Sequence, residues 1–355
     1  MDQLDWSGTS PEADFNNIPI IDVSALRSSD LEKRQHLATR IYEACTEVGF
    51  FYIKDHGIPE ELISALHTAA HQFFALPMDQ KMDVYVGKST KYRGFMPLYA
   101  EQTPTGDPTD ATEQGATGAL SESFDIGYEI SADPLRAAGD VLPPDIYDLY
   151  GDNLWPSDAV LPGFRVTYLR YCAEALTLCR MLMRSFALAL SLDEHFFDDS
   201  VNYPGVTSRM LHYPPQPVEG KVIDGLGAHT DYECFTILSQ DNVPALQVRN
   251  ACGEWMLAPP IPGTLVVNIA DCLSMWTNKK FKSTVHRVTN LTGQERYSIP
   301  FFFGVDYDTT VSVLPNCVSA DRSECTKPFK AGEFVRAQLA KTYVGYGQEP
   351  PANDY

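Results

Sequence analysis

The sequence is poor in basic residues. It contains 27 Lys and Arg against 47 Asp and Glu, which gives a formal net charge of −20. Binding to a nucleic-acid backbone depends on clustered cationic side chains, and the sequence shows no such cluster, so we expect no nucleic-acid partner. The eight cysteines are scattered without a CxxC pair, which argues against a disulfide framework and indicates reduced thiols.

Long apolar runs are also missing. No stretch approaches the roughly 20 apolar residues that a membrane span requires, so we expect no membrane partner. The first 17 residues are acidic and lack the apolar core of a signal peptide, and the last residues carry no targeting motif. We therefore expect a cytoplasmic protein, and the sequence leaves its oligomeric state open.

The first part of the chain alternates strand and helix patterns. Short apolar runs predict strands over 18–26 and 49–58, and apolar residues at helical spacing predict helices over 31–48 and 59–77. Residues 103–120 are rich in Thr, Gly, Pro and Asp with little to bury, which predicts an exposed loop.

The second part begins with the longest helical pattern, over 164–192, which has a broad apolar stripe. Short β-rich runs separated by turns occupy 209–313 and predict an antiparallel sandwich or barrel, followed by an amphipathic helix over 331–344. We therefore divide the chain into an N-terminal region of strands and helices, residues 1–150, and a region with scaffold helix, β core and final helix, residues 151–355.

Two side chains in GAHTDYECFTIL can reach the same point in space. Residues i and i+2 of a strand project to the same face, so His229 and Asp231 can reach one point in space. A metal ion is one candidate for that point, and a pair of surface residues at a turn is the alternative. His286 lies in a second β-like run, and two imidazoles with one carboxylate suit Fe(II) and leave three coordination positions free.

An arginine and a serine share the same spacing further along the chain. Arg296 and Ser298, in QERYSIPFFFGV, are i and i+2 on a presumptive strand and would point into the β core. A buried Arg requires an anion, and the carboxylate of a bound dicarboxylic acid suits its planar guanidinium. An internal Arg–Asp pair is the alternative.

The ordered motifs H-T-D, S-T-x-H-R-V and R-x-S, with VGFFYIKDHGIP at 48–59 and VVNIADCLSMWTN at 266–278, resemble the isopenicillin N synthase-like branch of the Fe(II)/2-oxoglutarate dioxygenases. The resemblance runs from about residue 18 to about residue 345. It implies a mainly β protein with flanking helices, in which a double-stranded β-helix, or jelly roll, lies behind a helical N-terminal region. It also implies specific roles for the three candidate metal ligands and for the R-x-S pair. Iron would be bound by His229, Asp231 and His286, and the far carboxylate of 2-oxoglutarate by Arg296 and Ser298.

The family pattern assigns a role to one further residue, and three other positions depart from the pattern. Tyr213, before the prolines of RMLHYPPQP, matches a family Tyr that contacts 2-oxoglutarate, with a core Tyr as the alternative. Leu211 replaces the family's usual Asn, and Ala270 and Lys279 replace frequent glycines. None of these three is an implied ligand, so only the turn geometry and pocket shape are expected to differ.

The resemblance implies an oxidoreductase that uses Fe(II), 2-oxoglutarate and O2, with ascorbate as a candidate reductant. It would oxidise a small organic metabolite of secondary metabolism by hydroxylation, desaturation or ring formation, with release of succinate and CO2. Two alternatives stay open: an Fe(II) oxidase of the same fold that needs no 2-oxoglutarate, and a non-catalytic ligand-binding relative.

Candidate substrate contacts are aromatic and basic side chains near these motifs, and each has a structural alternative, since aromatics in a jelly roll commonly fill the core and Arg93 can equally lie at the surface. We interpret His56 as structural and expect His212 on the opposite strand face from Tyr213. The candidates are Tyr232, Phe235, Phe302, Arg93, Phe95 and Tyr99.

Overall fold

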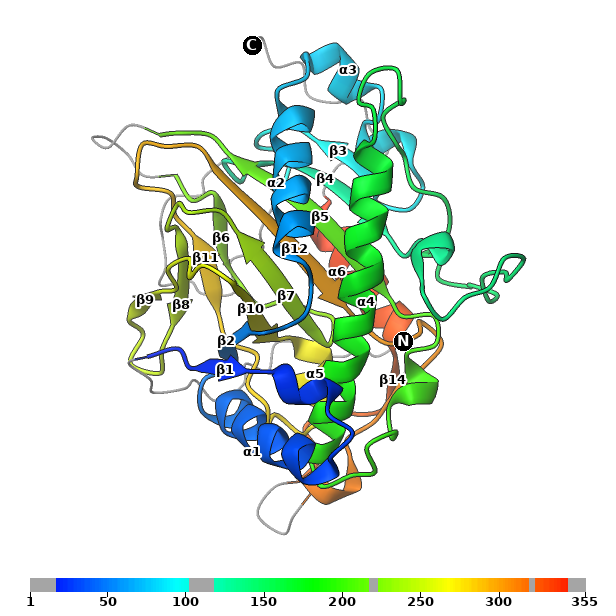
Figure 1. The fold of residues 1–355 in the computed structure, drawn as a ribbon, viewed down its shortest axis with the longest axis vertical. Coiled ribbons are helices and arrows are strands. Elements are labelled where there is room, and N and C mark those ends of the chain that lie inside the picture. The colour runs from blue at the N-terminus through cyan, green and yellow to red at the C-terminus, as the bar shows by residue number, and fades with distance from the viewer. Residues whose placement is uncertain (1–16, 102–117, 217–222, 319–322, 344–355) are drawn as a thin grey trace.

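The computed structural model describes residues 17–101, 118–216, 223–318 and 323–343. Within them the strands form sheets of eight, four and two strands (Figure 1). The strands are β1 (Ile20–Asp22), β2 (Phe50–Lys54), β3 (Gly94–Met96), β4 (Glu122–Gly127), β5 (Val206–Tyr213), β6 (Leu226–His229), β7 (Phe235–Gln240), β8 (Leu246–Arg249), β9 (Trp255–Leu257), β10 (Thr264–Ile269), β11 (His286–Val288), β12 (Arg296–Phe303), β13 (Thr310–Val311) and β14 (Phe329–Lys330).

The helices lie mainly before the core strands and after them. The α-helices are α1 (Leu31–Glu47), α2 (Glu60–Phe74), α3 (Met78–Met82), α4 (Phe164–Ala189), α5 (Asp271–Trp276) and α6 (Ala331–Thr342). Short 3-10 helices cover Ser24–Arg27, Val86–Lys88, Ile130–Ala132, Asp198–Ser200 and Pro315–Cys317. Helix α4 packs against both α1 and α2, and the three helices lie over one face of the eight-stranded sheet (Figure 1).

Two sheets face each other to form the β core. The larger has the order β1-β2-β10-β7-β12-β5-β4-β3 and the smaller β6-β11-β8-β9, and paired strands are antiparallel except β1 with β2. A buried cluster joins Tyr52 and Leu211 of the larger sheet to Val248 and Val288 of the smaller. In the described part of the chain the sheets do not close into a barrel. This arrangement, with flanking helices, confirms the predicted jelly-roll core.

Strand β12 shows how the sequence separates the two faces of the larger sheet. Ile299, Phe301 and Phe303 belong to the apolar cluster under the helices, because alternate side chains of a strand project to opposite faces. Arg296 and Ser298 lie on the other face, toward the smaller sheet. The inner face therefore carries Arg296 and Ser298 beside the apolar cluster between the sheets, while the outer face is largely apolar and covered by helices.

Helix α1 illustrates how local sequence sets an element's ends. Asp30 precedes it, and its carboxylate accepts a hydrogen bond of 3.0 Å from the backbone N–H of Glu32, which satisfies one free donor of the first turn. Gly49 follows its end with φ of 77°, and a Cβ there would lie 2.2 Å from the carbonyl oxygen of Lys282. Only glycine fits this left-handed, closely packed position.

The other predicted elements are also present, although the first two strands are shorter than expected and the end of 18–26 belongs to the 3-10 helix Ser24–Arg27. They are β1 for 18–26, β2 for 49–58, α2 for 59–77, α4 for 164–192 and α6 for 331–344. The predicted loop over 103–120 falls outside the described residues except for its last three. Among the described residues, every helix is too short or too polar to span a bilayer.

Candidate metal centre and its surroundings

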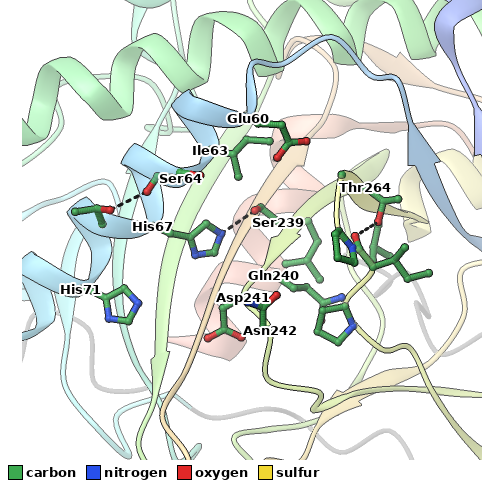
Figure 2. A pocket seen from close by; sticks show the side chains of 17 residues that line it. Glu60, Ile63, Ser64, His67, His71, Ser239, Gln240, Asp241, Asn242 and Thr264 are labelled. Carbon is green, nitrogen blue, oxygen red and sulfur yellow. Dashed lines mark hydrogen bonds between the residues drawn. The ribbon is translucent and has the colours of Figure 1, made fainter.

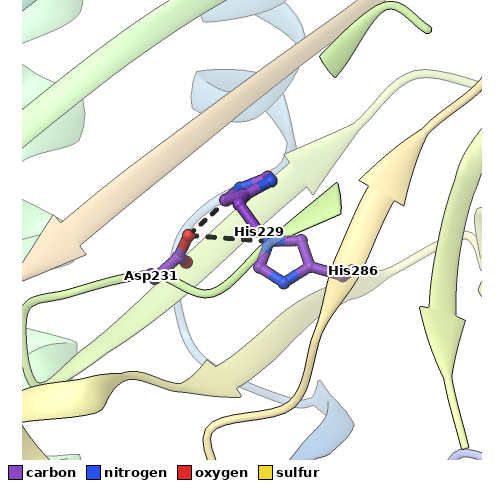
Figure 3. Close-up of side chains that lie close together, drawn as sticks. All are labelled: His229, Asp231 and His286. Atoms are coloured by element: carbon purple, nitrogen blue, oxygen red, sulfur yellow. Dashed lines mark ion pairs between the residues drawn. The ribbon is translucent and has the colours of Figure 1, made fainter. Parts of the chain in front are cut away.

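Three side chains from two strands and a turn converge on one point (Figure 3). His229 ends β6 and pairs in register with His286 of β11, while Asp231 lies just beyond the end of β6 rather than within the predicted strand. The Nε2 atoms of both histidines lie 3.5 Å from Asp231 Oδ1. Within the described chain, this is the one group of His, Cys, Asp and Glu whose ligand atoms are close enough to hold a metal, all within 4.8 Å of one another.

Hydrogen bonds to main-chain carbonyls fix the orientation of both imidazoles. The Nδ1 atom of His229 lies 2.7 Å from the carbonyl oxygen of Gly227, and that of His286 lies 3.2 Å from the carbonyl oxygen of Thr284. An Nδ1–H that donates to a carbonyl leaves Nε2 with a free lone pair, which is the form that binds a metal. Burial, together with nearby His229, lowers the pKa of His286 to about 4 and so favours this neutral form.

The carboxylate of Asp231 is held by its other oxygen. Oδ2 accepts hydrogen bonds from the hydroxyl of Thr236 and, at 2.7 Å, from the side-chain amide of Asn268. Burial alone would raise the pKa of Asp231, but the imidazoles of His286 and His229 and the Thr236 hydroxyl hold it well below its usual range. Oδ1 therefore remains an ionised acceptor directed at the two histidines.

Arg296 lies on the same inner face with no anionic partner among the described residues. It is fully buried; its guanidinium donates to Ser298 Oγ at 3.2 Å and to Gln240 Oε1 at 3.0 Å, and its Nε has no hydrogen-bond partner. The internal Arg–Asp pair is thus not found in the described chain. The guanidinium carbon lies 4.9 Å from the ring centre of Tyr213, the residue opposite Arg296 on β5.

Strand β7 connects the metal cluster to the buried Arg296. Thr236, which supports Asp231, and Gln240, which contacts Arg296, are four residues apart on β7 and therefore share one face. At about 3.3 Å per residue their separation is roughly 13 Å along the strand. The metal cluster and the buried arginine thus lie at two ends of one strand face.

Two of the predicted substrate contacts lie beside the metal cluster. Phe302 opposes Thr236 across β12 and β7, so it shares the inner face with the residue that supports Asp231. Tyr232 is half-buried and adjoins Asp231; burial raises the pKa of its phenol, and the nearby Glu233 carboxylate raises it further.

Phe235 and Phe95, two of the predicted substrate contacts, lie in the helix-covered core and not on the inner face. Phe235 lies on the opposite face of β7 from Thr236, and its ring packs against Phe186 of α4 at 5.2 Å between ring centres. Phe95 is fully buried in the same apolar layer, 6.0 Å from the ring of Phe73. Both side chains belong to the helix-covered core because strand alternation directs them away from the inner face.

Arg93 is buried, so it does not lie at the surface. Its guanidinium donates to the carbonyl oxygens of Gly151 and, at 2.6 Å, Leu149, which ties the chain before β3 to the 149–151 segment. Tyr99 is half-buried with a left-handed φ of 64°, and its backbone N–H donates to the carbonyl oxygen of Ala119. Neither arrangement supplies a contact with the metal cluster.

The two remaining histidines of the sequence analysis have structural contacts, as predicted. The Nδ1 of His56 accepts a hydrogen bond of 3.2 Å from the backbone N–H of Ile58. His212 lies 2.8 Å from a carboxylate oxygen of Glu122 and stacks on Tyr297, on the opposite strand face from Tyr213.

The structure accommodates each of the three residues that depart from the family pattern in a different way. Ala270 has an extended backbone with φ of −113°, so this position does not need glycine. Lys279 has φ of 57°, a left-handed conformation that glycine adopts at no steric cost, and the chain accepts lysine there. Leu211 joins the apolar cluster between the sheets.

Comparison with known proteins identifies the family. A model of the non-haem dioxygenase in morphine synthesis N-terminal region matches residues 18–158, and a model of the 2OG-Fe(II) oxygenase superfamily matches residues 201–305. The 2-oxoglutarate-Fe(II) type oxidoreductase hxnY of Emericella nidulans is 36% identical over 332 residues, covering 92% of this chain and 90% of the relative. The chain belongs to the 2OG-Fe(II) oxygenases. It is therefore an Fe(II)- and 2-oxoglutarate-dependent oxygenase with a small-molecule substrate.

Further members of the family match this chain with similar identity and coverage. Homoarginine-6-hydroxylase 2-ODD-C23 of Glycine max is 33% identical over 348 residues, covering 93% of this chain and 98% of the relative. The crystal structure of a full-length Neurospora crassa protein in complex with alpha-KG and thymine has a TM-score of 0.76 and 28% identity, covering 93% of this chain and 99% of that one. The structure of JOX2 with 2OG, Fe and JA has a TM-score of 0.72 and 26% identity, covering 98% and 92%.

The residues of this oxygenase fit the two groups that the family uses. Two imidazole nitrogens and one carboxylate oxygen on one side of a point form a donor set suited to Fe(II) with open positions. A buried guanidinium with a partnerless Nε suits a carboxylate from a small diacid, since an unpaired buried charge costs several kcal/mol.

Sequence reasoning missed a buried ion network around Arg209 on β5. Its guanidinium donates to both oxygens of Asp125 at 2.8 and 2.9 Å, to both oxygens of Glu101 at 2.7 and 2.9 Å, and to the hydroxyl of Tyr343 at 2.8 Å. The network joins β4, β5, the chain after β3 and the residue that follows α6. Its members are separated by long stretches of sequence, so no local motif reveals them.

A pocket of about 430 Å³ lies between α2, the end of β7 and the start of β10 (Figure 2). His67 of α2 points into it, and its Nε2 lies 2.8 Å from the hydroxyl of Ser239. Gln240, which contacts Arg296, also lines this pocket. The pocket therefore lies behind the buried arginine and not at the candidate metal cluster.

Proposed function

We propose that His229, Asp231 and His286 bind the iron of this oxygenase. The observation that carries the proposal is the convergence of three ligand atoms. The other polar atom of each of these side chains already has a hydrogen-bond partner in the protein. Each Nδ1 faces a carbonyl, and Asp231 Oδ2 is occupied by Thr236 and Asn268. Only the metal-facing atoms remain available.

Arg296 and Ser298 bind the far carboxylate of 2-oxoglutarate, with Tyr213 closing the same pocket. The guanidinium supplies fixed, planar donors, and the Ser298 hydroxyl adds one hydrogen bond. The ring of Tyr213 covers one side of the guanidinium, which limits access of water to the ion pair.

When bound, iron and 2-oxoglutarate would activate O2, the oxidant, and succinate and CO2 would be released along with the oxidised substrate. The protein itself orients the bound groups and excludes water from them. Asn268 and Thr236 hold one oxygen of Asp231, Arg296 fixes the orientation of the diacid, and the apolar cluster between the sheets keeps the inner face dry.

The primary substrate is a small organic metabolite that is hydroxylated, desaturated or cyclised, and Phe302 and Tyr232 contact it. The relatives named above are described with different small molecules, homoarginine and thymine among them, so none of these substrates is transferred to this chain. We further propose a cytoplasmic role in secondary metabolism without a nucleic-acid or membrane partner, and a functional division into residues 1–150 and 151–355.

Succinate formation tests the proposal. Wild-type protein should form succinate only with both Fe(II) and 2-oxoglutarate, and His229→Ala should abolish this while retaining the native circular dichroism spectrum. Asp158→Asn, which removes an exposed carboxylate, should behave as wild type. Substrate oxidation without 2-oxoglutarate would favour the oxidase alternative, and undiminished succinate formation by His229→Ala would contradict the ligand assignment.

A further inference from the structure

Glu233 is a buried carboxylate without a partner in the described chain. The residue is 2% exposed, and neither carboxylate oxygen has a hydrogen-bond partner. No Lys, Arg or His of the described residues forms an ion pair with it. A buried carboxyl group without a hydrogen-bond partner lowers stability, whether it is ionised or protonated. Such a group is a candidate for a contact that only a ligand completes.

The side chain of Glu233 lies at the end of the inner face, beside the candidate metal centre. It is two residues beyond Asp231, and a Cβ built at Gly304 would lie 3.6 Å from its Cβ and 3.7 Å from its carboxyl carbon. Gly304 directly follows Phe303, the last residue of β12, so Glu233 lies at the end of the strand that carries Phe302. Glycine at 304 thus leaves room for the Glu233 side chain at this end of β12.

The charges around Glu233 favour a cationic partner. Burial raises the pKa of the neighbouring Tyr232 phenol; the carboxylates of Glu233, Asp231 and Glu101 raise it further, and the guanidinium of Arg209 lowers it. Asp125 and Glu101 already occupy the guanidinium of Arg209, so that arginine is committed to two carboxylates. The net charge of −20 also attracts cations to the protein as a whole.

We propose that Glu233 is a substrate-recognition residue whose carboxylate pairs with a cationic nitrogen group, an ammonium or a guanidinium, on the small-molecule substrate. The inference rests on the proposed function, because it assigns that substrate to the face that carries the metal centre. A charged donor offsets the desolvation of a carboxylate better than a neutral donor, since hydrogen bonds to charged groups are about twice as strong. Glu233 therefore selects for charge and not only for shape.

Isosteric probe pairs test the charge selection. We would load the protein with Ni(II) and 2-oxoglutarate and measure dissociation constants by calorimetry for n-butylguanidinium against n-butylurea and for L-arginine against L-citrulline. Wild type should bind at least one cation about tenfold more tightly than its neutral partner. In Glu233→Gln this ratio should fall to about one, while Asp158→Asn, an exposed carboxylate removed elsewhere, should keep the wild-type ratio.

The outcomes separate the inference from the proposed function. Equal binding of the charged and neutral probes by wild type, or an unchanged ratio in Glu233→Gln, would overturn the role of Glu233. Binding of 2-oxoglutarate, measured on the same Ni(II)-loaded samples, reports on the proposed function, and its absence in wild type would overturn both. Glu233→Ser provides a second variant if the glutamine variant does not fold.

Discussion

The side-chain amide of Asn268 donates a hydrogen bond of 2.7 Å to the oxygen of Asp231 that faces away from the two histidines. Asn268 lies on β10 and Asp231 after β6, so the contact connects the larger sheet to the turn that carries the carboxylate. It fixes the carboxylate plane before any metal is present. A preorganised ligand loses less conformational freedom when it binds.

Asn268→Ala should therefore weaken metal binding without unfolding the protein. Loss of such an outer hydrogen bond typically lowers metal affinity about 10- to 100-fold. Competition with a chelator, monitored by metal content of the recovered protein, measures the change. Asn202→Ala, at an exposed position, is the matched control and should keep wild-type affinity. Equal metal retention by both variants would argue against the positioning role of Asn268.

Arg296→Met should impair 2-oxoglutarate binding and leave metal binding intact. A hydrogen-bonded pair with a charged partner contributes about 1.5–3 kcal/mol, so the apparent KM for 2-oxoglutarate should rise at least about tenfold. Wild type should also unfold at a higher temperature when 2-oxoglutarate is present in excess, and this shift should disappear in the variant. Arg170→Met, on the exposed side of α4, is the control. An unchanged KM would remove Arg296 from the diacid site.

The candidate ligands could be predicted because their spacing is local and their chemistry is specific. His229 and Asp231 are two residues apart, and the motif around His286 follows in the expected order along the chain. The long helix α4 was equally accessible, since its apolar stripe continues over 26 residues. In both cases the decisive information lies in residues close together in sequence.

The orientation of individual strand residues could not be predicted in the same way. Phe235 and Thr236 are neighbours, and only the register of β7 between β10 and β12 determines which of them faces the inner side. The partners of Arg209 lie 84, 108 and 134 residues away, so its buried network depends on the complete fold. No local pattern encodes either feature.

Arg209→Met should destabilise the oxygenase strongly. Removal of one partner from a buried ion pair leaves uncompensated charge, here on Asp125 and Glu101, and costs about 3–5 kcal/mol. Urea unfolding measures the loss in free energy. Adding Asp125→Asn and Glu101→Gln to the same protein should recover much of that stability, because the stranded carboxylates are then neutral.

An exposed ion pair provides the contrast for this test. Arg184 pairs with Asp198 at 2.9 Å on the surface, where such pairs contribute about 0–1 kcal/mol. Arg184→Met should therefore change the free energy of unfolding only slightly. Similar losses in the Arg209 and Arg184 variants would show that the buried network carries no special stability.

His67, which lines the pocket behind Arg296, should make the protein less stable in mild acid. Burial, together with the positive charges of His71 and Arg296, lowers the pKa of His67 to about 4, so the unfolded chain binds a proton near pH 6.5 that the folded protein binds only near pH 4. Stability that this neutral imidazole contributes is present above pH 6.5 and is lost as the pH falls toward 4. His67→Gln should therefore reduce the loss in unfolding free energy between pH 7 and pH 4 by roughly 2 kcal/mol. His36→Gln, on the exposed face of α1, leaves His67 in place and should retain the wild-type pH profile. Parallel profiles for wild type and His67→Gln would show that His67 does not titrate in this range.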